Sequence, residues 1–249
     1  MAKHPLRAGL LGAVVTAGTA VALPAAVASA TTTAPPPAPA STPATGPHFT
    51  QQQQRLEQQL AFRVTTLGHL TADVDGSTTL SASDKTTLTT RLASETTAIG
   101  ALVTKVPTDT TFAELKTDRS SMIEANRVYA VMVPQVFETI EADSVTSQVT
   151  ALEANEAALQ ASVNSLSGQP GYARATHEYA AFVRLVNSAA ADSAAVDSSV
   201  MAQIPQDYPG DRHVFVTASH KLLASELAIA HASYAEMVIG LATGGQTTS

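Results

Sequence analysis

The chain has 249 residues, a net charge of −7, neither cysteine nor tryptophan, and only 4% aromatic residues. The absence of cysteine excludes disulfide scaffolds, zinc ribbons, iron–sulfur proteins and cysteine nucleophiles. Nucleic-acid binding needs clustered basic residues, and the 14 Lys and Arg are scattered, so we expect no nucleic-acid partner.

Residues 1–30 have the pattern of a secretory signal peptide. Lys3 and Arg7 form a positive start, small and apolar residues follow up to Leu23, and Ala28-Ser29-Ala30 matches an A-x-A cleavage site. The alternative is an uncleaved anchor, but a spanning helix needs about 20 apolar residues. We therefore expect cleavage at this site, a secreted or cell-wall-associated protein, and no stable membrane insertion afterwards.

Three further regions follow the signal peptide. Residues 31–47 are rich in Thr, Ala and Pro and cannot bury apolar surface, so they predict an extended linker. This composition also suits O-glycosylation, which stays open. Residues 48–241 predict a helical domain, because strong helix formers dominate and apolar residues recur every three or four positions. Residues 242–249 predict a flexible tail.

Six helical segments account for this domain. Ser81 to Asp84 resembles a capping box that opens the second segment, and Pro107 stops it because proline lacks the amide that a helix uses. Thr108 or Asp109 is expected to cap the third. The sixth has an apolar repeat at Val216, Leu223, Leu227, Tyr234, Met237 and Leu241. The segments cover about residues 50–74, 81–106, 110–133, 145–166, 172–202 and 211–241.

Pro134 decides how the segments are arranged. It lies in an apolar run from Val131 to Ile140 without a neighbouring turn cluster, so it predicts a kink rather than a helix end. The third and fourth segments would then form one helix about 85 Å long. The sequence thus predicts an all-α fold, an antiparallel bundle of long helices arranged as two three-helix bundles sharing a Pro-kinked central helix. A compact up-down bundle with a break at Pro134 is the alternative.

Charged residues interrupt the apolar repeats of the first three segments. Arg63, Glu95 and Arg119 occupy repeat positions, and antiparallel folding brings them level, which predicts one ion cluster. The cluster can fix helix register, or bind an anion between the two arginines. A third interpretation rotates the repeats and leaves the charges at the solvated edge. The residues that would then face inward are Val64, Thr96 and Ile123.

The fourth segment has the most regular heptad pattern, with apolar residues alternating at spacings of four and three. Glu156 is its one charged position, and Arg184 is the nearest candidate partner across the turn at residues 168–171. The sequence therefore predicts a second ion pair.

No pattern of a catalytic or metal site occurs. His213, His220 and His231 lie on one stripe, but residues seven apart on a helix are about 10 Å apart and cannot share an ion. His177-Glu178 begins an H-E-x-x-H motif, but Ala181 stands where the second histidine is needed. The G-x-S-x-G motif and phosphate-binding glycine loops are also absent. We expect no metal, no cofactor and no enzymatic activity.

One patch carries a family resemblance. It consists of D-T-T-F-A-E-L from Asp109 to Leu115, Met122, Arg127-Val128-Tyr129, and Pro134-Gln135. In this order the patch resembles a family of uncharacterised exported helical proteins from high-GC Gram-positive bacteria. The resemblance covers most of the chain after the linker and implies an exported location and a helical fold, but no site.

Two functions fit these observations. The first is an exported, non-catalytic helical protein of the cell envelope that acts through an unknown envelope or extracellular partner or as a spacer. The second is a helical bundle that binds a small anion or an apolar molecule, near Arg63, Arg119 or Pro134.

Overall fold

The computed structural model describes residues 46–206, 208 and 213–244. The predicted signal peptide, the linker up to residue 45 and residues 245–249 of the predicted tail lie outside the described residues. Every regular element in the described part is a helix, and no strand occurs there, which confirms the all-α fold class. The α-helices are α1 (Pro47–Gly76), α2 (Ala82–Lys105), α3 (Phe112–Ser120), α4 (Val133–Ser165), α5 (Tyr172–Met201) and α6 (Val214–Gly244).

Side-chain caps begin α2 and α3. The Oγ of Ser81 accepts the backbone N–H of Asp84 at 3.1 Å, which confirms Ser81 as the cap of α2. The second bond of the predicted capping box does not form, because the backbone N–H of Ser81 donates to Asp143 at 2.7 Å. The expected cap of α3 at Thr108 or Asp109 is wrong, because Val106–Thr108 form a 3-10 turn and delay the helix. Thr111 caps α3 instead, in a complete capping box with Glu114.

The helix is interrupted at Asn126 and Arg127, not at Pro134. Arg127 has φ 31° and ψ 42°, the left-handed conformation, and π-helical turns (Ser121–Ala125 and Val128–Met132) lie on either side. Pro134 is the second residue of α4, which continues directly from the π-helical turn Val128–Met132, so the helical run passes through the proline. The predicted continuous helix through the third and fourth segments is therefore wrong, because the chain breaks at Arg127, and the kink at Pro134 stays a prediction.

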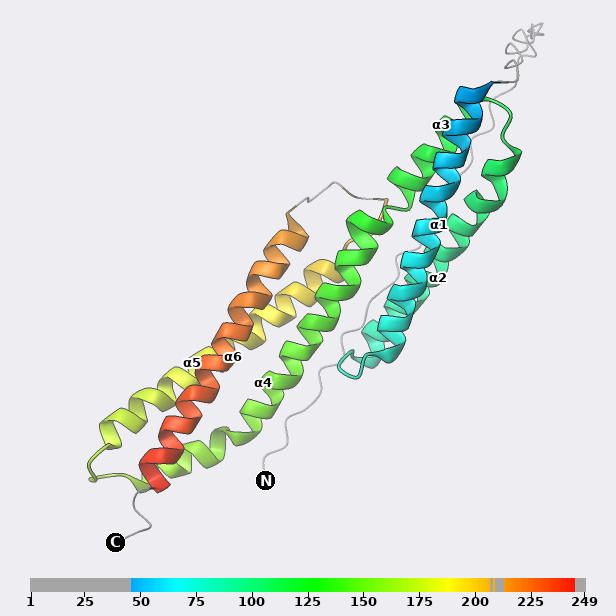
Figure 1. Cartoon of the computed structure of the whole chain (residues 1–249). Coiled ribbons are helices and arrows are strands. Elements are labelled where there is room, and N and C mark those ends of the chain that lie inside the picture. Colours follow the sequence, from blue (N-terminus) through cyan, green and yellow to red (C-terminus); the bar gives the residue numbers. More distant parts are fainter. Residues whose placement is uncertain (1–45, 207, 209–212, 245–249) are drawn as a thin grey trace, which may run out of the picture. The chain divides into compact units, whose positions relative to one another are not determined.

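Figure 1 shows the helices as ribbons. Two clusters of buried apolar residues hold them together. The first cluster joins α1, α2 and α3 with the turns before α4, and includes Leu60, Leu88 and Met122. The second joins α4, α5 and α6, and includes Phe182 and Leu222. Burying such a side chain stabilises the folded state by about 1.5–3 kcal/mol, so each cluster is a substantial core.

The apolar repeats of α1, α2 and α4 face these cores as predicted. In α1 and α2 every apolar repeat position is buried, and so is Glu95, whereas Val64 and Ile123 are 40% and 41% exposed. The rotated repeat is therefore wrong. The heptad of α4 is confirmed, with all its apolar residues buried: Val145, Val149, Leu152, Leu159, Val163 and Leu166.

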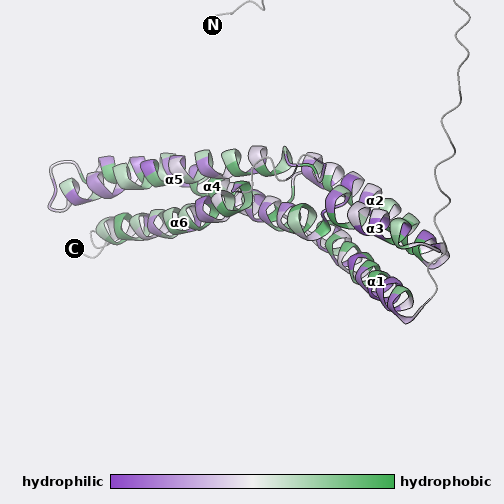
Figure 2. Cartoon of the chain, turned by 90° about the horizontal axis from the view of Figure 1, so that it is seen from above, coloured by the Kyte–Doolittle hydropathy of each residue, from purple (hydrophilic) through white to green (hydrophobic). Residues whose placement is uncertain are grey.

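The apolar repeat of α6 lies on the opposite face from the one that packs. Helix α6 contacts α4 and α5 through the residues on its other side, among them Ala218, Leu222 and Ala232. Figure 2 shows apolar residues along the full length of α6. By length and composition, α6 is the one helix of the described part that could cross a membrane. All six residues of the predicted repeat are more than half exposed.

Candidate functional site

The predicted cluster of Arg63, Glu95 and Arg119 does not form. The ion pairs among the described residues are made by Lys105 and Lys221, and none involves the three predicted residues. The predicted repeats are confirmed in α1 and α2, but not in α3, where Arg119 is exposed and its neighbour Asp118 is buried. A long side chain can start from a buried helix position and carry its charge elsewhere.

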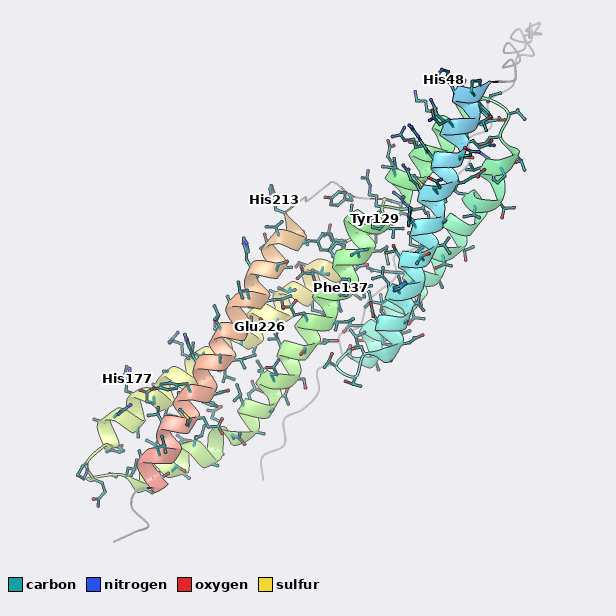
Figure 3. All side chains as sticks on the ribbon, in the orientation of Figure 1. His48, Tyr129, Phe137, His177, His213 and Glu226 are labelled. Atoms are coloured by element: carbon teal, nitrogen blue, oxygen red, sulfur yellow. The ribbon has the colours of Figure 1, made fainter. Side chains whose placement is uncertain are left out.

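The guanidinium of Arg63 stacks on an aromatic ring instead. It lies 5.0 Å from the ring centroid of Tyr129, and its Nη1 donates to the carbonyl of Gln59 at 3.1 Å. Tyr129, labelled in Figure 3, comes from the turns that follow the break at Arg127, and its hydroxyl lies 3.3 Å from that of Thr66. Burial lowers the pKa of Arg63. The break at Arg127 thus supplies the partner of Arg63.

Glu95 has no cationic partner among the described residues. Its side chain is buried, its Oε2 accepts no hydrogen bond, and burial raises the pKa of its carboxyl to about 7. A carboxyl in this setting is stabilised as the neutral acid, because desolvation disfavours the charged form.

The predicted pair of Glu156 and Arg184 is also corrected. The Oε1 of Glu156 accepts a hydrogen bond from the hydroxyl of Tyr179 at 3.2 Å, and Arg184 is exposed and forms no ion pair with a described residue. Tyr179 lies on the side of α5 that faces Glu156, so the tyrosine is the partner of Glu156 in place of the predicted arginine.

The patch that carries the family resemblance has structural roles. Asp109 and the buried Asp118 both pair with Lys105, and burial raises the pKa of Asp109 to about 6. Thr111 and Glu114 form the capping box. The hydrogen bond that the backbone N–H of Thr110 donates to the carboxylate of Glu114 lowers the pKa of Glu114. These residues start α3 and hold it against the end of α2.

Arg119 lies in a groove between α1 and α3, which we call the α1–α3 groove. It has a volume of about 470 Å³. Its lining combines three cations, two side-chain amides and three apolar residues. These residues are Gln52, Arg55, Leu56 and Gln59 from α1, and Phe112, Leu115, Lys116 and Arg119 from α3.

Helical spacing explains why these residues meet. On α1, Gln52, Arg55 and Gln59 follow one another at spacings of three and four, and residues so spaced share a helix face. On α3, Lys116 and Arg119 have the same relation. The ring of Phe112 packs edge-on against that of Phe49, with centroids 5.4 Å apart, which holds the start of α3 against α1.

The groove is cationic although the chain as a whole is acidic. Arg55, Lys116 and Arg119 are exposed, and none of them forms an ion pair with a described residue. Among the described residues, no Asp, Glu, Ser or His lines the groove. The lining therefore offers hydrogen-bond donors, positive charge and apolar contact, and Lys116 is its one described side chain of a type that can act as a nucleophile or base.

The sequence pattern points to Arg119 but not to the rest of this groove. The helix repeats predict a cluster of Arg119 with Arg63 and Glu95, whereas the second arginine of the groove is Arg55. The signal that could have found Arg55 and Lys116 is their spacing, because each lies next to a buried leucine of a helix repeat, Leu56 and Leu115.

Within the described part of the chain, no three His, Asp or Glu side chains are grouped so that they could hold a metal ion. The resemblance to exported proteins of high-GC Gram-positive bacteria remains a prediction. No protein-family model, no curated protein and no solved structure matches the chain.

Proposed function

We propose that the chain is an exported, non-catalytic binding protein of the cell envelope, and that the α1–α3 groove holds an anionic group of its partner. The observation that carries this proposal is the lining of the groove, in which three cations and two amides converge without a carboxylate. The chain has a net charge of −7. In such a chain, a group of cations with no acidic residue beside it favours the binding of an anion more than it favours the stability of the fold.

The sequence pattern of residues 1–30 supports export, and residues 31–47 have the composition of a spacer. A described lining of cations, amides and apolar residues, without a carboxylate, hydroxyl or imidazole, supports binding rather than catalysis. The partner would then be an envelope or extracellular molecule that approaches the helical domain from solution.

The finer arrangement of the helices belongs to the same proposal. We infer two three-helix bundles that share a central element made of α3 and α4, broken at Arg127. The two separate core clusters support this arrangement, since one contains α1, α2 and α3 and the other α4, α5 and α6.

The ligand chemistry follows from the donors. Guanidinium groups bind phosphate and carboxylate oxygens with two parallel hydrogen bonds, and an ammonium adds a point charge. Phe112, Leu56 and Leu115 supply an apolar surface beside the charges. A chain of closely spaced phosphates fits three exposed cations better than a single small anion does. A small apolar ligand is the alternative.

Thermal melting with short-chain polyphosphate tests the proposal. A ligand that binds the native state raises Tm by mass action, so the wild-type Tm should rise with polyphosphate concentration at constant ionic strength. The double variant Arg55→Gln/Arg119→Gln should lose most of the rise. The matched control, Arg174→Gln/Arg184→Gln on α5, removes the same charge from exposed positions and should retain it.

Three outcomes contradict the proposal. An equal rise in the groove variant and the control would indicate non-specific charge attraction. No rise in the wild-type protein would show that the groove does not hold polyanions. A rise with uncharged lipid alone would favour the apolar ligand.

A further inference from the structure

The exposed face of α6 carries a regular apolar stripe, which we call the α6 stripe. Its large members are between 53% and 70% exposed. Single exposed apolar residues are common, but a continuous apolar patch usually marks an interaction site. The stripe consists of Val216, Leu223, Leu227, Ala230, Tyr234, Met237 and Leu241, with the polar His220 between Val216 and Leu223.

The spacing along the α6 stripe alternates between four and three from end to end. This is the heptad pattern of a coiled coil, sustained over three and a half heptads. From Val216 to Leu241 the stripe extends about 38 Å, at 1.5 Å per residue. Helices α4 and α5 cover the opposite side of α6, so no described element covers the stripe.

We propose that the α6 stripe binds the α6 stripe of a second copy of this chain, in a parallel, in-register coiled coil. His220, Leu227, Tyr234 and Leu241 take the a positions, and Val216, Leu223, Ala230 and Met237 the d positions. The same residues face each other in both copies, as a two-fold symmetric interface requires.

The charges beside the stripe favour the parallel orientation. Glu226 precedes an a position and His231 follows a d position, so they are g and e residues, five positions apart. In a parallel coiled coil a g residue faces the e residue five positions later on the other helix. Glu226, labelled in Figure 3 midway along α6, would face His231 of the second copy. In an antiparallel pair the two Glu226 side chains would share one edge and repel each other.

The composition of this face argues against a membrane as the occupant. Helices that lie on membranes carry Lys and Arg beside their apolar face. The single Lys of α6, Lys221, forms an ion pair with Asp192 at 3.3 Å. The charged residue next to the stripe is the acidic Glu226. The other flanking residues include Ser219 and Ala224, which are small enough to let a second helix approach closely.

Sedimentation of the purified full chain over a range of concentrations tests the association. One helix per copy gives an interface near the small end of the usual range, so we expect a reversible monomer–dimer equilibrium with Kd on the order of micromolar. Leu227→Glu/Met237→Glu places charges in the stripe and should weaken the dimer at least 100-fold. The control Val103→Glu/Phe137→Glu changes apolar residues that are similarly exposed on α2 and α4, and should leave Kd unchanged.

Engineered cysteines test the orientation, because the chain has no cysteine of its own. Ala230→Cys puts one thiol at a d position, which faces its own copy in the parallel pair, and should oxidise to a covalent dimer. The exposed position Ala101→Cys on α2 should not. Preferential cross-linking of Leu227→Cys to Ala230→Cys would instead indicate an antiparallel pair and overturn the proposed orientation.

A chain that stays monomeric at about 0.2 mM, far above a micromolar Kd, would overturn the proposal. The stripe would be assigned to a membrane instead if the chain stays monomeric and floats with phosphatidylcholine–phosphatidylglycerol vesicles, while the variant Leu227→Glu/Met237→Glu does not float with them. No residue of the α1–α3 groove lies on α6. The dimer and the anion-binding proposal therefore fail independently.

Discussion

Glu95 is a charged residue at a buried position of a helix repeat, and its expected partners contact other groups. Arg63 stacks on Tyr129, and Arg119 lies in the α1–α3 groove, so the carboxyl of Glu95 is buried without a cation. Its pKa is raised to about 7 by burial. Glu95 therefore favours the folded state only while it is protonated.

We expect Glu95→Gln to reduce the loss of stability with rising pH. The pKa of Glu95 is about 7 in the folded chain against 4.5 in its ordinary range. The stabilisation from its proton is thus complete below about pH 4.5 and is lost as the pH rises through 7. The whole difference is on the order of 3 kcal/mol.

Urea unfolding at about pH 5 and pH 8 measures this effect. Burial also raises the pKa values of Asp109 and Asp197 to about 6, and these groups contribute equally to both proteins. The wild-type protein should lose more unfolding free energy between the two pH values than Glu95→Gln. Equal losses would show that Glu95 titrates normally in the folded chain.

At the scale of elements, α6 shows that a helix with two apolar faces is ambiguous in sequence. Leu222 is fully buried against α4 and α5, and the next residue, Leu223, is 56% exposed. Large apolar residues lie on both faces, since Ile229 and Ile239 are buried beside alanine and serine on the packed face. Periodicity identifies the two faces but does not say which one packs.

Alanine substitutions at these neighbours separate the two faces. Leu222→Ala should lower the unfolding free energy by about 2–5 kcal/mol, because it leaves a cavity in the core. Leu223→Ala should change it by less than about 0.5 kcal/mol when measured at concentrations where the chain is monomeric. Chemical unfolding of both variants checks the orientation of α6, and the reverse order of losses would mean that the predicted repeat packs after all.

For the whole molecule, a group of polar contacts ties the two cores together at the end of α5. Arg91 of α2 donates to the carbonyls of Met201 and Gln203, at 2.8 and 3.1 Å. Gln135 of α4 donates to the carbonyls of Val200 and Gln203, at 2.8 and 2.9 Å. The last carbonyls of a helix lack partners within it, so residues of α2 and α4 satisfy the end of α5.

We expect Arg91→Ala to loosen this junction. The loss of a charged donor to two partly buried carbonyls should lower the unfolding free energy by about 2 kcal/mol. Amide hydrogen exchange should become faster at residues 198–206, while the interior of α1 stays protected. Arg174→Ala, at an exposed position of α5, is the control and should change neither quantity. Unchanged exchange in Arg91→Ala would show that the contact does not couple the two cores.

The sequence alone determined the features that depend on local physics. Helix propensity and apolar spacing predicted an all-helical chain, and the cap at Ser81 and the repeats of α1, α2 and α4 were correct. A cap involves residues three apart, and a repeat spans one helix, so both can be recognised without the rest of the fold.

Only the tertiary structure decided the features that depend on distant partners. The left-handed Arg127 breaks the helix where no glycine marks a turn, and this break brings Tyr129 to Arg63. That contact separates Arg63 from Glu95. The α1–α3 groove needs α1 and α3 side by side, and the packed face of α6 depends on which of its two sides fits α4 and α5 more closely. Long charged side chains reach several neighbours, so their partners follow from the packing of helices and not from spacing within one helix.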